Sequence, residues 1–255
     1  TKIMDGKTAF GPRVGYYMQA RPDYPAAVAA CLRDVYGLTE TAVIADIGCG
    51  TGKLARLFLE NGNPVYGVEP DAEMRAASQA YLRDFARFTA VNGTAEATNL
   101  PTAGIDFVVA GQAAHWFERT GAEAEFRRIC RPGGKIALVW NQRQRETPIV
   151  REFDAILHTF RQPTPHLRRA NAVPVDVMAL AGPQARLHTF LMVQELDFDA
   201  LVARMLSISF VPLPGEAGHE ALLAKLQQFF ADFAENGRIR LPYTTELYVG
   251  QQPSS

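Results

Sequence analysis

Apolar runs with the length of strands alternate along the chain with segments whose apolar positions recur at helical period. The first half shows this most clearly, with a helical pattern at 25–35, an apolar run at 42–47 and an amphipathic segment that ends at Gly62. Strands and helices that alternate in this way form βαβ units, in which helices join parallel strands. The pattern therefore predicts an α/β fold with a parallel sheet.

Later segments extend this pattern and then depart from it. Four further strands are predicted, at 64–70, 87–94, 105–111 and 133–141. Asp71 is placed to cap the helix after the first of these, and a helix at 121–130 joins the last two. Strand-like runs at 185–198 and 239–250, separated by helices, predict an antiparallel pair at the sheet edge. The sheet then has seven strands and is doubly wound and mostly parallel.

The 255 residues are enough for one large α/β domain with a lid. We expect a single domain over 1–255, and its predicted parts are an N-terminal flap helix at 1–35, a core at 42–141, an inserted lid at 142–182 and a C-terminal part at 183–250. The lid assignment rests on arginines scattered among prolines and short helical patterns. Helices at 199–207 and 219–236 belong to the C-terminal part.

Charge and cysteine content limit the classes of partner and of metal or disulfide site that the chain is expected to have. The chain has 26 basic and 27 acidic residues, so its balance favours a small-molecule substrate over nucleic acid or an anionic membrane. Cys31, Cys49 and Cys130 are widely spaced, which argues against a disulfide framework and a zinc site. Because the sequence shows neither a signal peptide nor a membrane-spanning run, we expect a cytoplasmic protein, a monomer or homodimer, without a metal.

A glycine loop, Gly48-x-Gly50-x-Gly52, follows the strand that ends near Asp46. Its spacing differs from the G-x-G-x-x-G loop that binds a pyrophosphate, so a dinucleotide fits poorly. Glu69, at the end of the next strand, lies about 20 residues after the loop, where an acidic side chain can accept hydrogen bonds from ribose hydroxyls. An adenosine without phosphates would satisfy both observations.

Five segments carry a family resemblance: "VIADIGCGTGKLA", "VYGVEPD", "GTAEATNLP", "DFVVAGQAAHWF" and "RICRPGGKIALVWN". In order and spacing they resemble class I S-adenosylmethionine-dependent methyltransferases, most closely the small-molecule type 11 group, over residues 10–141. The resemblance implies a Rossmann-like fold and S-adenosylmethionine as cofactor. The Asn/Asp-Pro-Pro-Tyr motif of methyltransferases acting on nucleic acid or protein amino groups is absent, which favours a small acceptor.

The resemblance also implies cofactor-binding residues. They are Tyr17, Arg21, Asp46, Gly48, Cys49, Gly50, Gly52, Glu69, Pro70, Thr94, Ala95, Glu96 and Gln112. The glycines are expected behind the methionine part, with Asp46 near its amino group and Arg21 near its carboxylate. Thr94 stands where the family often has an acidic residue that meets the adenine amino group, so Thr94, Ala95 and Glu96 share that role.

Methyl transfer depends mainly on aligning nucleophile, methyl and sulfur, so we expect positioning to dominate catalysis. His115, after the fourth strand, is a candidate general base or, alternatively, a structural histidine. The candidate substrate-pocket residues are Phe10, Tyr16, Trp116, Trp140, Asn141 and Ser207. Arg143, Arg145 and Arg151 are either carboxylate-binding residues or the solvated face of the lid.

Three other functions stay open. S-adenosylmethionine can itself be the substrate of a lyase-like cyclisation of its aminobutyrate arm, which gives a product of the azetidine-2-carboxylate type and releases methylthioadenosine. A nicotinamide-dependent oxidoreductase shares the architecture, although the glycine spacing argues against it. A non-catalytic S-adenosylmethionine-binding protein would bind without turnover.

Overall fold

The computed structural model describes residues 15–16, 20–162, 179–182 and 184–251. Contacts divide the chain into two compact units. Unit 1 takes its described residues from 1–22, 142–168 and 191–244, and unit 2 from 23–141, 169–190 and 245–255. Each unit is described by itself below. The predicted single domain with a flap and a lid stays a prediction.

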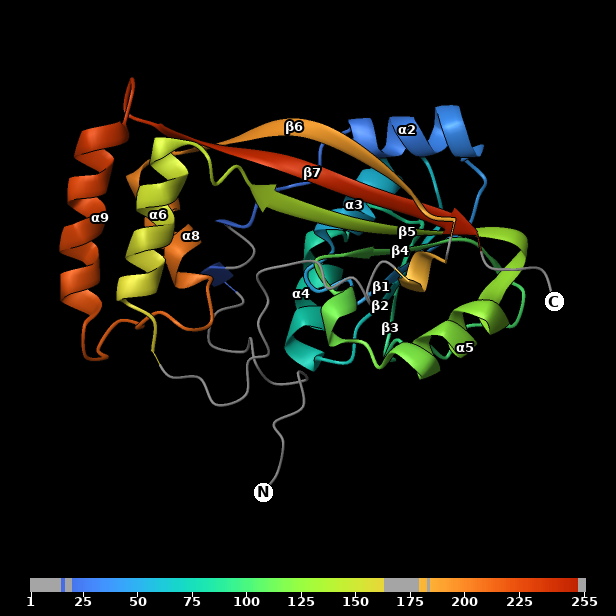
Figure 1. Cartoon of the computed structure of the whole chain (residues 1–255). Helices are drawn as coiled ribbons and strands as arrows, with labels where there is room; N and C mark the ends of the chain where they lie inside the picture. Colours follow the sequence, from blue (N-terminus) through green and yellow to red (C-terminus); the bar gives the residue numbers. More distant parts are fainter. Residues whose placement is uncertain (1–14, 17–19, 163–178, 183, 252–255) are drawn as a thin grey trace. The chain divides into compact units, whose positions relative to one another are not determined.

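A seven-stranded sheet runs in the order β3-β2-β1-β4-β5-β7-β6 (Figure 1). Its strands are β1 Ile44–Ile47, β2 Val65–Val68, β3 Phe88–Val91, β4 Ile105–Gly111, β5 Cys130–Arg143, β6 Arg186–Leu196 and β7 Ile239–Gln251. The first five are paired in parallel, and β7 runs antiparallel to β5. The predicted mostly parallel seven-stranded sheet with an antiparallel strand towards its edge is confirmed.

The strand order reverses between β1 and β4, which lie side by side with Ile44 opposite Phe107. From β1 the chain crosses to β2 and then β3 on one side of the sheet. From β4 it crosses to β5 on the other side. The loops after β1 and β4 therefore diverge at the carboxyl ends of these strands. In open α/β sheets, ligands bind in the crevice at such a switch point.

Hydrophobic clusters cover both faces of the unit 2 sheet. Neighbouring residues of β1 show the division, because Ile44 belongs to one cluster and Ala45 to the other, and both are fully buried. Helices α2 Ala27–Tyr36 and α3 Lys53–Glu60 contribute to the cluster of Ile44, and α5 Arg119–Ile129 contributes to that of Ala45. Burial on both faces is why the parallel strands read as continuous apolar runs.

Two helices of unit 2 begin at acidic caps. The Asp71 carboxylate accepts hydrogen bonds from the backbone amides of Glu73 and Met74, both at 2.9 Å, at the start of α4 Ala72–Tyr81. This confirms the predicted cap. The Glu118 side chain plays the same part for α5, which begins two residues before the predicted helix at 121–130. The predicted boundary was wrong because this cap lies in the unrecognised turn "FERTG".

Unit 1 is a helical cluster with its own hydrophobic core. It contains α6 Pro148–Thr159, α8 Phe198–Leu206 and α9 His219–Phe233, and α9 packs against the other two. Phe153 and Phe229 meet edge to face with ring centroids 6.1 Å apart. Helix α6 lies within the predicted lid at 142–182, whereas 163–178 lie outside the described residues.

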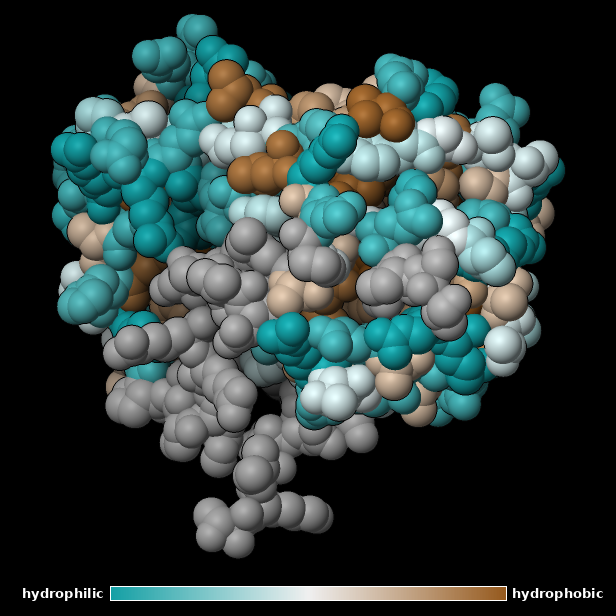
Figure 2. Space-filling view, turned by 45° about the vertical axis from the view of Figure 1, so that its right-hand side comes forward, coloured by the Kyte–Doolittle hydropathy of each residue, from teal (hydrophilic) through white to brown (hydrophobic). Residues whose placement is uncertain are grey.

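Surface hydrophobic residues on the face drawn in Figure 2 are interspersed with hydrophilic ones. Within the described residues, the large exposed apolar side chains are Val35, Trp116, Leu187, Leu191 and Val193. Scattered residues of this kind are normal on folded proteins. No helix in the described part of the chain has the length and apolar character needed to cross a membrane.

Candidate functional site

The glycine loop lies at the carboxyl end of β1, next to the loop after β4. Gly48 has φ +66°, and a Cβ there would lie 2.8 Å from the Cβ of Ala113. Gly52 has φ +88°, and a Cβ there would lie 2.6 Å from Cδ1 of Leu82. Left-handed backbone and close packing thus require glycine at both positions.

Gly50 requires a different explanation. Its φ is +55°, but a Cβ built there would meet no atom within 4 Å. Its amide donates a 2.9 Å hydrogen bond to Oε2 of Glu69. The middle of the loop therefore presents bare backbone to open space, which a ligand can approach closely.

Glu69 is buried at the end of β2, with 8% of its surface exposed. Besides Gly50, it accepts a 3.0 Å hydrogen bond from the amide of Asp71 to its other oxygen. Burial raises the pKa of the Glu69 carboxyl, and these two amides partly offset that rise. Each carboxylate oxygen accepts one protein hydrogen bond and keeps capacity for another.

Asp46, at the end of β1, is fully buried, and neither of its carboxylate oxygens has a hydrogen-bond partner within the described residues. Burial raises its pKa to about 8. The nearby backbone amide of Ala55 lowers this pKa somewhat, although it is not within hydrogen-bonding geometry of the carboxyl. The negative charge of Glu69 raises the pKa further. A buried carboxyl without a donor is costly, so this group is prepared for a ligand that supplies one.

Two other loop residues are buried beside these carboxyls. Burial, followed by the charges of Asp46 and Glu69, raises the pKa of the Cys49 thiol well above its usual value, so the thiol is neutral. The Thr51 hydroxyl is buried and has no hydrogen-bond partner within the described residues. Sequence reasoning missed Thr51, although it stands between the two last glycines of the loop.

Gln112 and Asn141 come together at the carboxyl ends of β4 and β5. Gln112 has a left-handed φ of +55°, and its Nε2 donates a 3.0 Å hydrogen bond to the Asn141 carbonyl. The Asn141 amide donates to the Asp23 carbonyl at 3.1 Å and accepts from the Thr245 hydroxyl at 2.6 Å. Positive φ at a non-glycine residue is uncommon and concentrates at functional sites.

The segment before α2, which belongs to the predicted flap, also lies at this edge, although sequence reasoning did not single out its residues Asp23 and Tyr24. The Tyr24 hydroxyl packs against Gly111, the last residue of β4, where no Cβ would fit. Lys53 at the start of α3 forms a 2.6 Å ion pair with Asp23. The available signal was an aromatic residue directly before the first strongly patterned helix.

His115 lies in the short 3-10 helix η3 Ala114–Trp116, after β4. Its ring lies 4.8 Å from that of Trp116, between centroids, and makes no hydrogen bond to any described residue. Burial lowers the pKa of the His115 imidazole to about 4. The ring is therefore neutral at neutral pH, able to accept a proton but weakly basic.

The loop after β3 makes a tight turn in which the Thr94 amide donates to the Ala97 carbonyl at 3.0 Å. Ala95, inside the turn, is buried. The Glu96 carboxylate accepts a 2.8 Å hydrogen bond from the Glu118 amide, so this side chain supports the start of α5. Of the three residues predicted to share one role, Glu96 thus already has a structural partner.

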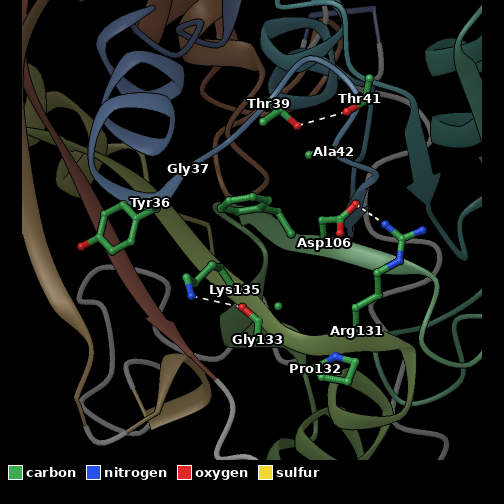
Figure 3. A pocket seen from close by; sticks show the side chains of 12 residues that line it. Tyr36, Gly37, Thr39, Thr41, Ala42, Asp106, Arg131, Pro132, Gly133 and Lys135 are labelled. Carbon is green, nitrogen blue, oxygen red and sulfur yellow. Dashed lines mark hydrogen bonds and ion pairs between the residues drawn. The ribbon is translucent and has the colours of Figure 1, made fainter.

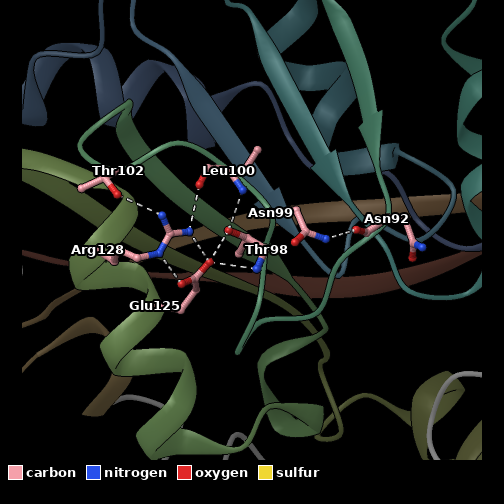
Figure 4. Close-up of polar contacts among 7 residues, drawn as sticks. All are labelled: Asn92, Thr98, Asn99, Leu100, Thr102, Glu125 and Arg128. Carbon is pink, nitrogen blue, oxygen red and sulfur yellow. Dashed lines mark hydrogen bonds and ion pairs between the residues drawn. The ribbon is translucent and has the colours of Figure 1, made fainter.

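A cluster of polar contacts fixes the rest of this loop (Figure 4). Oε1 of Glu125 accepts hydrogen bonds from the amide and hydroxyl of Thr98, at 2.8 and 2.5 Å. Arg128 pairs with Glu125 and donates to the Leu100 carbonyl at 2.8 Å. The cluster holds the loop after β3 against α5.

The other predicted residues have the following surroundings, except for two that lie outside the described part. Trp140 is buried in a hydrophobic cluster of unit 2, and Trp116 is 37% exposed. In unit 1, Tyr16 packs against the core and the Arg21 guanidinium donates to the Ser207 carbonyl at 3.2 Å. The Pro70 carbonyl accepts a hydrogen bond from Arg75 at 3.3 Å. Phe10 and Tyr17 lie outside the described residues.

The three arginines predicted either to bind a carboxylate or to be solvated all have acidic partners. Arg143 and Arg145 lie 2.8 and 3.6 Å from the Asp154 carboxylate, and Arg151 lies 3.7 Å from that of Glu146. Each arginine thus has an acidic partner, and Arg143 and Arg145 share theirs.

A polar hollow of about 310 Å³ lies at the opposite edge of the sheet (Figure 3). Tyr36 and Lys135 line it, together with Asp106, which forms a 2.6 Å ion pair with Arg131. It lies at the amino ends of β1 and β4, whereas ligands of doubly wound sheets bind at the carboxyl ends. We therefore place the candidate site at the glycine loop. No group of three potential metal ligands gathers anywhere among the described residues.

Sequence comparison identifies relatives of the core. Residues 45–138 match the family model described as "Methyltransferase domain". An uncharacterized methyltransferase of Schizosaccharomyces pombe is 33% identical over 159 residues, which is 62% of each chain. One from Mycobacterium bovis is 36% identical over 153 residues, or 60% of each chain. The chain thus spans about three fifths of the length of these curated relatives.

Solved structures share the fold. A protein of Anaeromyxobacter dehalogenans assigned as a type II methyltransferase superposes with a TM-score of 0.68 at 22% identity, covering 92% of this chain and 99% of its own. The YcgJ protein of Bacillus subtilis superposes with a TM-score of 0.56 at 18% identity, covering 91% of this chain and all of its own. Residues 45–138 are thus similar to methyltransferase domains, and the superposed structures show that the chain shares their fold.

Proposed function

We propose that this chain transfers the methyl group of S-adenosylmethionine to a small-molecule acceptor with an oxygen, nitrogen or carbon nucleophile. The observation that carries the proposal is the open backbone at Gly50 beside two buried carboxyls, Asp46 and Glu69, at the switch point of the sheet. The balanced charge of the chain supports a small molecule over a polyanion.

The residues at this edge suit the chemistry of the cofactor. Asp46 needs a donor, which the ammonium of the methionine part supplies, and burial strengthens that pairing. Glu69 keeps acceptor capacity for ribose hydroxyls. The third glycine of the loop stands one position earlier than in the G-x-G-x-x-G loop that binds a pyrophosphate, and S-adenosylmethionine has no pyrophosphate. When bound, it supplies a methyl group on a sulfonium, which is a good leaving group.

The chain itself contributes positioning and exclusion of water. Buried groups around the loop lower the local dielectric, and the Gln112–Asn141–Thr245 hydrogen bonds join the carboxyl ends of β4 and β5 to the middle of β7. The neutral His115 imidazole is the proposed proton acceptor, and its low pKa limits it to nucleophiles that lose their proton easily.

The test compares two glycines. Gly50 and Gly37 both have positive φ, +55° and +74°, and neither would place a Cβ within 4 Å of another atom. The strain of substitution is therefore similar, about 1 kcal/mol, but Gly37 lines the hollow at the opposite edge. We expect G50A to weaken S-adenosylhomocysteine binding about tenfold or more by calorimetry, and G37A to leave it unchanged. Equal affinities in both variants would remove the loop from the binding site.

Product analysis separates methyl transfer from consumption of the cofactor. The protein is incubated with S-adenosylmethionine alone, and the nucleosides are identified by mass spectrometry. We expect intact S-adenosylmethionine until an acceptor is added, after which S-adenosylhomocysteine forms. Rapid enzyme-dependent release of methylthioadenosine would contradict the proposal and indicate the lyase reaction.

A further inference from the structure

Arg204 is a buried arginine in the last turn of α8, in unit 1, with 2% of its surface exposed. Its Nη1 and Nη2 donate long hydrogen bonds of 3.4 Å to the hydroxyls of Ser207 and Tyr243. Its Nε is buried without a hydrogen-bond partner, and no acidic side chain among the described residues pairs with the guanidinium. Arg204 is thus a buried cation that this part of the chain does not neutralise.

The surroundings of Arg204 add positive charge. Burial alone would raise the pKa of the Tyr243 phenol, yet that pKa is lowered, because Arg204 and then Arg143 and Arg21 favour the phenolate. Arg143 is bound to Asp154 at 2.8 Å, so its charge has a partner. Within the described residues, Arg204 thus differs from Arg143 in having no acidic partner.

Magnitudes show that the protein alone does not offset this charge. Burying an unpaired ion costs several kcal/mol even after relaxation. The carboxyl end of α8, where Arg204 lies, offsets about 0.3–2 kcal/mol through the helix dipole, and two neutral hydrogen bonds at 3.4 Å add little. The remaining cost is removed when an anion binds beside Nε.

The geometry of the guanidinium selects the kind of anion. A planar guanidinium binds the two oxygens of a carboxylate through parallel N–H groups, and the free Nε–H of Arg204 offers such an edge. One uncompensated positive charge matches a carboxylate, which carries one negative charge, better than a phosphate dianion. The hydroxyls of Ser207 and Tyr243 are further donors or acceptors beside it.

We propose that Arg204, with Tyr243 and Ser207, forms a binding site in unit 1 for the carboxylate of a small organic acid. Arg204 thereby takes the role that sequence reasoning considered for Arg143, Arg145 and Arg151.

The test uses acetate and succinate as probes at constant ionic strength, by calorimetry on the full chain. R204M keeps a long apolar side chain and removes the charge. The control is R240M, because Arg240 lies in the same unit, is 62% exposed and pairs with Glu195. We expect the probes to bind wild type and R240M, and to bind R204M about tenfold or more weakly. Without probes, R204M should melt no lower than wild type.

Three results would overturn the proposal: no probe binding to wild type, equal binding to R204M, or equally strong binding of inorganic phosphate. Should R204M fail to fold, Y243F serves instead, with an expected loss of several-fold in probe affinity; unchanged affinity would count against the proposal.

A parallel titration separates the two sources of a carboxylate. S-adenosylhomocysteine carries the carboxylate of the methionine part, and methylthioadenosine lacks it. If R204M weakened only the binding of S-adenosylhomocysteine, the carboxylate bound by Arg204 would be that of the cofactor. The assignment of Arg204 to the carboxylate of a small organic acid would then be wrong. If instead the proposed function were wrong, the wild type would bind acetate and succinate but not S-adenosylhomocysteine, so the two failures can be distinguished.

Discussion

Two arginines occupy the same kind of position, the last turn of a helix, in surroundings that differ in every other respect. Arg128 in α5 is 39% exposed, and all three of its guanidinium nitrogens donate hydrogen bonds, two of them to Glu125 at 2.7 Å (Figure 4). Arg204 in α8 is 2% exposed, and its guanidinium makes two hydrogen bonds within the described residues, both at 3.4 Å. The more deeply buried cation thus has the fewer partners.

The difference separates structural polar groups from those kept for a ligand. The Glu125 cluster satisfies its own hydrogen bonds and so stabilises the loop after β3. Arg204, Asp46 and Thr51 are buried polar groups left without full partners. Such groups cost stability in the free protein, and a ligand that satisfies them recovers that cost as affinity.

The largest effect is expected from breaking the satisfied cluster. Glu125→Ala leaves the Thr98 amide, the Thr98 hydroxyl and Arg128 without their acceptor, so the free energy of unfolding should fall by about 2–4 kcal/mol. Urea denaturation measures it. The control is Glu123→Ala on the same helix, which loses one exposed pair with Arg119 and should cost about 0.5 kcal/mol or less. Equal losses would show that the cluster is not structural.

The effect of Glu125 should also depend on pH. The pKa of its carboxyl is lowered from 4.5 to about 2, chiefly by the hydrogen bonds from Arg128, against the effect of burial. As the pH falls, the Glu125 carboxyl therefore becomes protonated in the unfolded state before it does so in the folded state. The stabilisation is present above about pH 4.5 and is lost as the pH falls towards 2. The gap between wild type and Glu125→Ala should narrow over that range.

Strands were easier to predict than helix boundaries. The predicted strand at 105–111 coincides with β4 because burial on both faces produces an unbroken apolar run between turn residues. The start of α5 was placed two residues late, because its Glu118 cap precedes a helix whose first turn contains Gly121 and lacks apolar periodicity. Boundaries depend on local hydrogen bonds that the apolar pattern does not encode.

The glycine loop of unit 2 and Arg204 of unit 1 differ in the same way. Gly48, Gly50 and Gly52 follow a strand within a few residues, so their spacing alone locates the loop. Arg204 was missed because its burial depends on how α8 packs, and the arginines at 142–182 drew attention instead. The available signal was its place on an apolar helix face, three residues after Leu201 and directly before Met205.

A smaller change in stability is expected from Asp46→Asn, and this substitution should stabilise the folded protein where Glu125→Ala destabilises it. The folded pKa of Asp46 is about 8 and its ordinary value is 3.8, so between these values the folded state holds a proton that the unfolded state has lost. Stability then falls as the pH rises from about 4 to 8. Asp46→Asn should remove this dependence and raise Tm at pH 8 by about 2–4 °C, or 1 kcal/mol.

At pH 8, where Asp46 begins to ionise, the same variant should bind S-adenosylhomocysteine at least about tenfold more weakly, since an amide cannot pair with the ammonium as a carboxylate does. At pH 5 the carboxyl is protonated, so the difference in affinity should be smaller. Thermal melts at pH 5 and 8, with calorimetry at each pH, measure both effects. A lower Tm at both pH values, with unchanged affinity, would make Asp46 a structural residue.

The smallest effect is expected from removing the Thr51 hydroxyl, for which Thr98 provides a matched comparison. Thr51 and Thr98 are both buried, but the Thr98 hydroxyl donates to Glu125 whereas that of Thr51 has no partner within the described residues. Thr98→Val should therefore cost about 1–2 kcal/mol, and Thr51→Val should change stability by no more than about 0.5 kcal/mol, because valine has the same shape and removes an unsatisfied group. Urea denaturation of both variants decides. If Thr51→Val were as costly as Thr98→Val, its hydroxyl would have a structural partner, and the distinction between satisfied and reserved polar groups would fail at the glycine loop.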